Sequence, residues 1–307
     1  NAAPFTYPQL YLRDHTGPGP LIQGVGAGNH YYRLSIGTDT IIGSEGSDIF
    51  VATRLGSLTA DDVFDGGAGF HWFELFHEPN QTLDLRTLQV TNMEGLYMYT
   101  DSLFIADAPT LAKFGEGLSL QGNATLQLAG AGFITTLGVD VYRGTLSLGL
   151  VDFAAGRGAF LRNDSVVTTA ASSLNLNSST VGQDAADADA RFTTSNTTGT
   201  NFFVANANTA AHVYGSVGAD TITATSLTFT AAERAGMFAR SIETIVDASG
   251  TYTANNPPSA SNDIANTSED TPVIISVLGN DTDADGDTLN ITHIDGQSAS
   301  VGAAITL

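Results

Sequence analysis

Residues 117–132 read GLSLQGNATLQLAGAG, and leucine stands at every second position on either side of a Gly-Asn break. Strict alternation of apolar and polar residues is typical of a β-strand that buries one face. Gly, Thr, Ser, Asn and Asp punctuate this and similar runs, and helical periodicity is scarce. The sequence therefore predicts an all-β chain. The other clear runs are TLDLRTLQV (82–90), GLYMYTDSLFIAD (95–107) and GTLSLGLVDF (144–153).

The spacing of these runs predicts how the strands are arranged. Apolar runs return about every 15–25 residues, which favours a coiled stack of strands in which each turn buries its inward side chains against the next. Glycine at the corners supplies the positive φ angles that tight turns need. We therefore expect a glycine-rich parallel β-solenoid or β-roll-like domain over residues 1–255.

Irregular segments interrupt this pattern. Two short helices are expected, one in 229–241, where Thr230 and Glu233 have capping-box spacing, and one in 107–117, ended by Gly115. The polar stretch 180–200 is expected to be an exposed loop. The Pro-Pro pair within GTYTANNPPSASND (250–262) indicates a linker, so we place a domain boundary after residue 255.

Charge and composition narrow the class of protein. The 307 residues include 32 acidic and 11 basic side chains, a formal net charge of −21, which repels nucleic acid and anionic membranes and attracts cations. There are no cysteines, so bound metal is the expected substitute for disulfides. No apolar run is long enough to span a bilayer, so we expect no membrane insertion. Both chain ends read as cuts, which predicts a piece of a longer protein.

The stretch SVLGNDTDADGDTLNI (276–291) concentrates acidic residues in one loop. Carboxylates so close together repel one another unless a cation neutralises them. Their alternation, with Gly286 inside, is that of the first half of an EF-hand calcium loop, although the glutamate at position 12 and the flanking helices are missing. The candidate ligands are Asn280, Asp281, Asp283, Asp285 and Asp287.

With its upstream context, this loop resembles the cadherin-like or Ig-like tandem repeat of giant bacterial surface proteins. The matching residues are Asn262–Asp263, Glu269–Asp270–Thr271, Val277–Leu278, Asn280–Asp281, Asp283, Asp285–Gly286–Asp287 and Leu289. The resemblance implies that 256–307 begins a β-sandwich repeat that is cut short. It also implies a Ca²⁺ site near the domain junction, held by Asp263, Glu269, Asp270 and the Asp281–Asp287 loop.

A second calcium motif recurs upstream. In GTDTIIGSEGSDIFV (37–51) and YGSVGADTITA (214–224), glycines and an aspartate precede an apolar residue, as in the nonapeptide Gly-Gly-x-Gly-x-Asp-x-apolar-x. A further unit, DGGAGFHWFEL (65–75), has His71 where aspartate is expected. These stretches resemble the RTX (repeats-in-toxin) group of secreted proteins. The resemblance implies calcium at Asp39, Asp48 and Asp220, and type I secretion.

No catalytic motif stands out. The chain has no G-x-S-x-G elbow and no phosphate-binding G-x-x-x-x-G-K, so we do not expect an enzyme. If a polysaccharide lyase or hydrolase were hosted here, converging carboxylates such as Asp101, Asp107, Asp140 and Asp152 would be required.

A glycan-binding role is an alternative, because aromatic residues cluster in YPQLYL, HYYRL, FHWFELF and LYMY. The neighbours of Trp72 nevertheless predict that it is buried. Together these observations predict a calcium-binding, adhesive or structural segment of a repetitive extracellular surface protein, acting in cell attachment or a biofilm matrix. Two alternatives stay open: a surface-layer or filament subunit whose identical copies are bridged by calcium, and a polysaccharide-binding or -cleaving solenoid.

Overall fold

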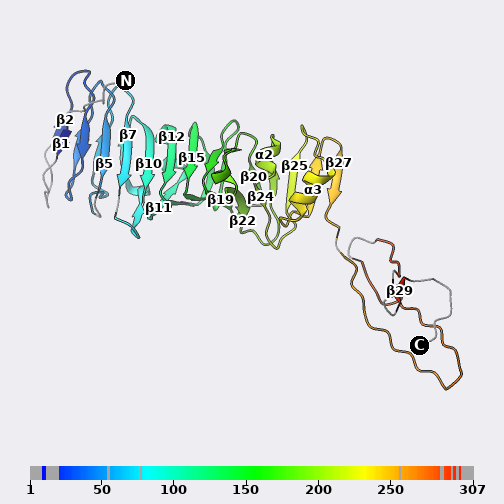
Figure 1. Cartoon of the computed structure of the whole chain (residues 1–307). Coiled ribbons are helices and arrows are strands. Elements are labelled where there is room, and N and C mark those ends of the chain that lie inside the picture. The colour runs from blue at the N-terminus through cyan, green and yellow to red at the C-terminus, as the bar shows by residue number, and fades with distance from the viewer. Residues whose placement is uncertain are drawn as a thin grey trace. The chain divides into compact units, whose positions relative to one another are not determined.

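The computed structural model describes residues 9–11, 21–53, 56–76, 78–255, 257–283, 287–291, 293–294 and 297–298. Contacts divide the chain into two units, Asn1–Tyr252 and Thr253–Leu307. The first is an all-β parallel solenoid of about 11 turns in the described part of the chain, as the alternating runs predict. Figure 1 shows the strands of successive turns lying side by side along it.

One long sheet runs along most of the solenoid. This nine-stranded sheet contains, in order, β1 (Gln9–Tyr11), β3 (Tyr31–Arg33), β5 (Ile49–Ala52), β7 (Trp72–Phe76), β10 (Met93–Tyr99), β12 (Phe114–Gln121), β15 (Gly138–Tyr142), β18 (Ala159–Arg162) and β21 (Thr180–Val181). Its neighbouring strands pair in parallel, and Tyr31 pairs with Ile49, 18 residues further along the chain.

The other sides of the same turns form further sheets. A four-stranded sheet holds β2 (Leu21–Gln23), β4 (Thr40–Ile42), β6 (Val63–Asp65) and β9 (Gln89–Thr91). A seven-stranded sheet holds β8 (Thr82–Asp84), β11 (Leu103–Asp107), β13 (Thr125–Ala129), β16 (Thr145–Ser147), β19 (Val166–Thr169), β22 (Arg191–Thr194) and β24 (Val213–Tyr214). A five-stranded sheet holds β20 (Ser173–Asn175), β23 (Asn201–Phe203), β25 (Thr221–Ala224), β26 (Thr244–Asp247) and β27 (Gly250–Thr253). The pair β14 (Ala131–Ile134) and β17 (Leu150–Phe153) completes the solenoid sheets.

The core consists of side chains stacked in register along the axis. In the nine-stranded sheet, the inward column that begins at Tyr32 and Phe50 is at most 2% exposed. Its members are Tyr32, Phe50, Phe73, Leu96, Leu118, Val139 and Ala159. Burying each large apolar side chain contributes about 1.5–3 kcal/mol, so repetition of the column stabilises the stack turn by turn.

Each long alternating run turns out to wrap around a corner. Residues 95–107 form β10 and β11 in different sheets, and residues 117–132 likewise supply β12, β13 and the start of β14. The corners before β8 and β13 hold Asn80 and Asn123, both at φ 63°. Asparagine tolerates this left-handed conformation better than most residues, so it can replace glycine there.

The helices are short. The capping box at Thr230 and Glu233 is confirmed, because it opens α3 (Ala231–Phe238). The helix expected in 107–117 is α1 (Ala108–Leu111), which Asp107 caps, but it ends before Gly115, which lies in β12. A further helix that the sequence did not indicate, α2 (Ala207–Ala210), is capped by Asn206. Two 3₁₀ turns, η1 (Leu85–Thr87) and η2 (Ala185–Asp187), occur in the described residues.

The stretch 180–200 is not one exposed loop, as the sequence suggested. It contains β21, η2 and β22, and Phe192 on β22 is fully buried. Strands this short need few inward-facing apolar side chains. The sequence of this turn is therefore mostly polar, and its strands are hard to recognise from alternation. In the second unit, β28 (His293–Ile294) pairs antiparallel with β29 (Gln297–Ser298).

Candidate functional site

The three aspartates of the predicted RTX-type turns lie in buried corners of the solenoid. Asp48 is fully buried, and its Oδ2 and Oδ1 accept the backbone N–H groups of Ser44 at 2.6 Å and His30 at 2.8 Å. Asp220 is also fully buried and accepts from Ser216 at 2.5 Å and Thr200 at 2.6 Å.

Asp39, at 3% exposure, uses the same kind of contact within its own turn. Its carboxylate accepts the backbone N–H of Ser35 at 2.9 Å and the hydroxyl of Ser35 at 2.8 Å. Charge-assisted hydrogen bonds of this kind are roughly twice as strong as neutral ones. At Asp48 and Asp220 they also clamp each turn to the turn before it.

Other residues that sequence reasoning missed extend these contacts along the axis. The backbone N–H of Asp39 donates to Asp62 at 2.7 Å, and that of Asp220 donates to Glu243 at 2.6 Å. Asp62 and Glu243 both stand directly before a strand. Both residues could have been identified from one signal in the sequence. Each is an acceptor side chain just before a strand, about one turn after the aspartate whose N–H it accepts.

His71 fills the position of an aspartate in this arrangement. Its Nδ1 accepts the backbone N–H of Asp48 at 3.2 Å, while the backbone N–H of His71 donates to Glu94 at 2.6 Å. The imidazole therefore makes the link to the preceding turn that Asp48 and Asp220 make, but not their second contact within the turn. The corner carboxylates thus have a structural role as hydrogen-bond acceptors, and calcium binding by Asp39, Asp48 and Asp220 stays a prediction.

In the second unit, the segment just before Asp263 contacts the acidic loop that begins at Asn280, so two parts of the predicted set of calcium ligands lie near each other. Ser259 and Thr282 form an antiparallel bridge with N···O distances of 2.7 and 3.0 Å. Beside it, the N–H of Ser261 donates to Asp281 Oδ1 at 2.8 Å, and Asn280 Nδ2 donates to the carbonyl of Asn262 at 3.4 Å. Asp263 thus follows directly on the segment that contacts the acidic loop.

The remaining predicted ligands are placed in different ways. Glu269 and Asp270 form an exposed turn, with Asp270 at φ 58°, and the N–H of Asp287 donates to Asp283 Oδ1 at 3.1 Å. Asp285 and Gly286 lie outside the described residues. Among the residues that are described, no three acidic or histidine side chains converge as a metal site. Ca²⁺ takes six to eight oxygens, so the described ligands by themselves do not make a complete site.

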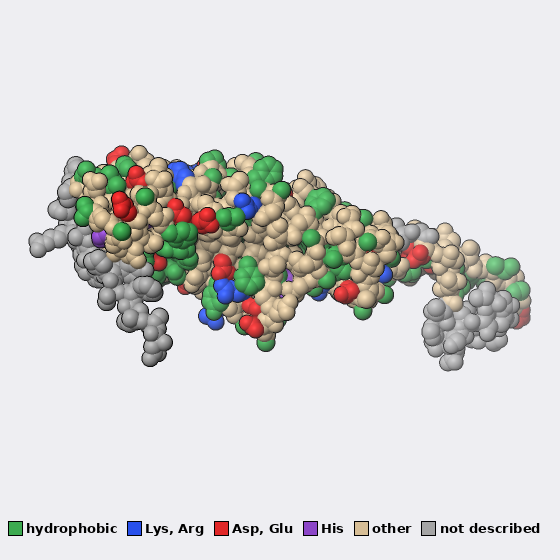
Figure 2. Space-filling view, turned by 90° about the horizontal axis from the view of Figure 1, so that it is seen from above, with side chains coloured by type: hydrophobic (Ala, Val, Ile, Leu, Met, Phe, Trp, Pro, Cys, Tyr) green, Lys and Arg blue, Asp and Glu red, His purple; other side chains and the backbone are tan. Residues whose placement is uncertain are grey.

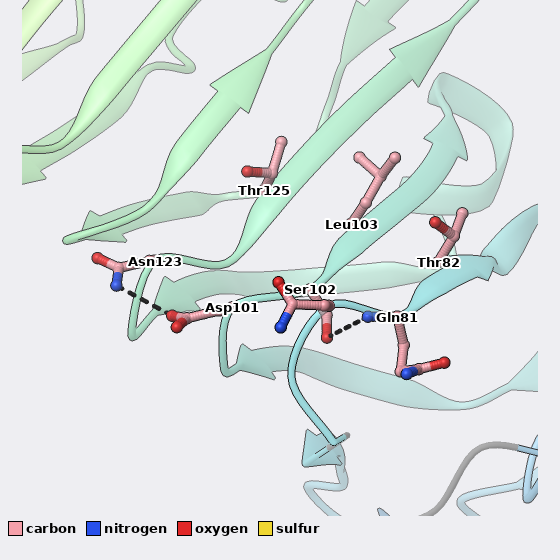
Figure 3. A pocket seen from close by; sticks show the side chains of 8 residues that line it. Gln81, Thr82, Asp101, Ser102, Leu103, Asn123 and Thr125 are labelled. Atoms are coloured by element: carbon pink, nitrogen blue, oxygen red, sulfur yellow. Dashed lines mark hydrogen bonds between the residues drawn. The ribbon is translucent and has the colours of Figure 1, made fainter.

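A polar hollow of about 350 Å³ lies at the corner before β8, β11 and β13. Figure 3 shows Asn123 directed at Asp101, whose Oδ1 accepts its amide at 2.9 Å, and Ser102 beside Gln81. The N–H of Asn80 donates to the carbonyl of Asp101 at 2.7 Å. These contacts link three successive turns. The polar side chains that line the hollow are therefore explained by their structural role.

The four carboxylates considered for polysaccharide cleavage have separate partners. Asp101 pairs with Asn123, Asp107 caps α1, Asp140 pairs with Arg162 at 2.5 Å, and Asp152 accepts the N–H of Asn175 at 2.8 Å. Each therefore has a structural partner of its own, three of them on a neighbouring turn, and the structure does not bring the four into a common site.

The outward positions of the nine-stranded sheet form an aromatic and acidic surface, which we call the outer face. Its residues are Trp72, Glu74 and Phe76 on β7, Tyr97 and Tyr99 on β10, Ser119 and Gln121 on β12, and Asp140 and Tyr142 on β15. The prediction that Trp72 is buried is wrong: it is half-buried on this face. Alternation along β7 places Phe73 and Leu75 inward and Trp72 outward. Of the other aromatic clusters, half of YPQLYL (residues 7, 8 and 12) lies outside the described residues.

The rings of the outer face contact one another in fixed geometries. Trp72 meets Tyr97 edge to face at 4.8 Å, and Phe76 stacks on Tyr99 at 4.2 Å between ring centroids. Burial raises the pKa of Glu74, and burial together with the nearby Glu74 charge raises the pKa of Tyr99 to about 12. Glu74 accepts no hydrogen bond that the described residues supply, so its carboxyl is available to a ligand.

Comparison with known proteins adds one finding. The family model of the cadherin-like domain matches residues 254–306. No curated protein and no solved structure matches the chain. The chain is thus a parallel β-solenoid followed by a cadherin-like domain. In the described residues, no helix is long and apolar enough to cross a membrane.

Proposed function

We propose that this chain is an extracellular adhesive or structural segment of a large repetitive surface protein, acting in cell attachment or a biofilm matrix. The observation that carries the proposal is the cadherin-like domain at 254–306, directly after the solenoid. A cadherin-like domain is typical of extracellular proteins with such a role. The formal charge of −21 and the absence of cysteine agree with a chain that meets free divalent cations outside the cell.

We further propose that Ca²⁺ binds the acidic loop of the second unit. Support comes from the alternating carboxylates of 281–287 and from the bridge between Ser259 and Thr282, beside which Asp281 accepts the N–H of Ser261. Bound calcium would neutralise the loop and tie it to the segment that follows the solenoid. Because an ion that binds the folded state alone stabilises it by mass action, calcium is expected to order this unit.

Calorimetry tests the calcium proposal. Adding Ca²⁺ to the chelated protein is expected to give saturable binding and to raise the melting temperature of the second unit. The double variant Asp281→Asn with Asp283→Asn should abolish both effects. Asp61→Asn, an exposed acid on the solenoid, serves as the matched control and should change neither. A melting temperature of the second unit that still rises with calcium in the double variant would contradict the assignment.

Light scattering and cell binding separate the adhesive role from the alternative of a calcium-bridged array. A monodisperse protein that binds cells in calcium supports adhesion. Growth of large particles on calcium addition, without cell binding, supports the array and contradicts the adhesive proposal.

A further inference from the structure

The indole of Trp72 leans over the next strand because residue 95 is glycine. A Cβ atom at Gly95 would lie 2.0 Å from Trp72 Cε3 and 2.3 Å from Cζ3, so the ring occupies the space of the missing side chain. Phe70 and Tyr97 pack edge to face against the same indole at 4.6 and 4.8 Å. The ring is therefore held rigidly on the sheet while it stays half-exposed.

Beyond Trp72, the same register column contains no side chains. Gly95 pairs with Gly117, and Gly117 pairs with Gly138. A Cβ at Gly117 would meet nothing within 4 Å, and one at Gly138 would meet only the Glu116 carbonyl, at 3.5 Å. The column is thus an open trough over Gly117 and Gly138, which the Trp72 indole closes at Gly95. From the indole over β10 to β15 it covers two strand spacings, or about 10 Å.

Polar and aromatic groups border this trough. The neighbouring column contains Glu74, Tyr97, Ser119 and Asp140 in register. The trough therefore has an aromatic platform at one end, bare backbone as its floor, and Glu74 and Tyr97 along one side. Asp140 is already paired with Arg162, and Ser119 is buried.

From this arrangement we infer that the trough over Gly117 and Gly138 binds a neutral polysaccharide strand, with one sugar ring stacked on Trp72. The apolar face of a pyranose suits an aromatic ring, while its hydroxyls suit carboxylate acceptors and hydroxyl partners. An extended open trough matches a linear polymer better than a compact ligand.

Charge decides between this ligand and other linear polymers. Glu74 borders the trough and the whole chain carries −21, so nucleic acids and uronate-rich glycans are repelled. Acidic side chains also lie on the side of the solenoid that Figure 2 shows.

The inference deepens the proposed adhesive function by naming a ligand, and it rests on that function. Trp72 is the single tryptophan of the chain, so its fluorescence reports directly on the site. The intact protein is titrated with cellohexaose, laminarihexaose, mannohexaose and xylohexaose as neutral probes, and with a hexamer of guluronate as the anionic probe. We expect at least one neutral hexasaccharide to shift the Trp72 emission saturably and the guluronate hexamer to have no effect.

Two variants locate the binding. Trp72→Ala, followed by calorimetry, should weaken binding about tenfold, the typical effect of losing one stacked ring. Gly117→Leu should fill the trough and weaken binding at least as much while keeping the Trp72 signal. Because nothing lies within 4 Å of the added Cβ, it should fold normally. Gln127→Leu, on the exposed side of β13, adds a similar side chain elsewhere and should bind like the wild type.

Several outcomes would overturn the inference. One is the absence of binding to every neutral hexasaccharide, and another is binding that Gly117→Leu leaves unchanged. Preference for the guluronate hexamer would also contradict it. If the Gly117→Leu protein still attaches to cells as the wild type does, this site fails while the adhesive function stands. If neither the wild type nor the variants attach to cells although the wild type binds the sugar, the adhesive function is contradicted instead.

Discussion

Asp220 shows what a single carboxylate contributes to a solenoid without disulfides. Both of its oxygens accept backbone N–H groups, from Ser216 in its own turn and from Thr200 in the turn before. Buried N–H groups without partners are costly, and the corner of a coil would otherwise leave such groups unpaired. The aspartate therefore gives two backbone N–H groups at the corner a hydrogen-bond partner and also links two successive turns.

This role predicts the effect of replacing Asp220. In Asp220→Asn, the amide group would face one of the two N–H donors, so we expect a loss of about 2 kcal/mol in the free energy of unfolding. Urea titration followed by circular dichroism measures it, with Asp61→Asn as the exposed control. The loss should be equal in calcium and in chelator. A loss confined to calcium would show that Asp220 is a metal ligand and that the structural explanation is wrong.

At the scale of elements, α3 is joined to the last turns of the solenoid through one buried carboxylate. Asp247, at the end of β26, accepts from Arg234 Nη1 on α3 at 2.9 Å and from the N–H of Phe229 at 3.1 Å. Burial opposes the charge of Asp247, but hydrogen bonds from Ser249, Phe229 and Arg234 outweigh it and hold its pKa at about 2. Arg234 also lies 3.7 Å above the ring of Tyr252.

The lowered pKa predicts how the docking of α3 depends on pH. An unfolded aspartate has a pKa of about 3.9, so the stabilisation by Asp247 is complete above that pH and is lost as pH falls through about 2. Asp247→Asn should cost about 3 kcal/mol at pH 7, because it leaves Arg234 without its buried partner. Unfolding at a series of pH values should show this difference shrinking toward pH 2. A constant difference over that range would contradict the assignment.

At the scale of the whole molecule, stability is expected to be divided between the two units. In the solenoid each turn contacts its neighbours, so the free energy of folding is close to a sum over adjacent turns. The boundary between the units lies at Tyr252 and Thr253. The second unit has mostly exposed side chains in its described residues, so it depends on other sources of stability, such as the proposed calcium.

A chain that ends at Asn255, just after β27, tests this division. Its main melting transition should match that of the intact protein within about 2 °C, in calcium and in chelator alike, because no turn of the solenoid loses a neighbour. Differential scanning calorimetry of both proteins measures it. A large drop in the melting temperature of the shortened chain would show that the units stabilise each other.

Local pattern was enough to determine the solenoid, the capping box of α3 and the resemblance of the C-terminal segment to a cadherin-like repeat. Alternation fixes which side chains share a strand face, and the return of apolar runs fixes the length of a turn. Both properties lie within a few residues of sequence, so they can be predicted without coordinates.

Tertiary structure decided where the chain turns and what the polar residues do. Alternation continues through the corner between β10 and β11, so 95–107 reads as one run although it supplies two sheets. The donors of Asp48 and Asp220 include residues 18 and 20 positions earlier, and the space for Trp72 is created by Gly95 on the next turn. Such contacts depend on how successive turns are aligned, and that alignment is set by the packing of the whole stack.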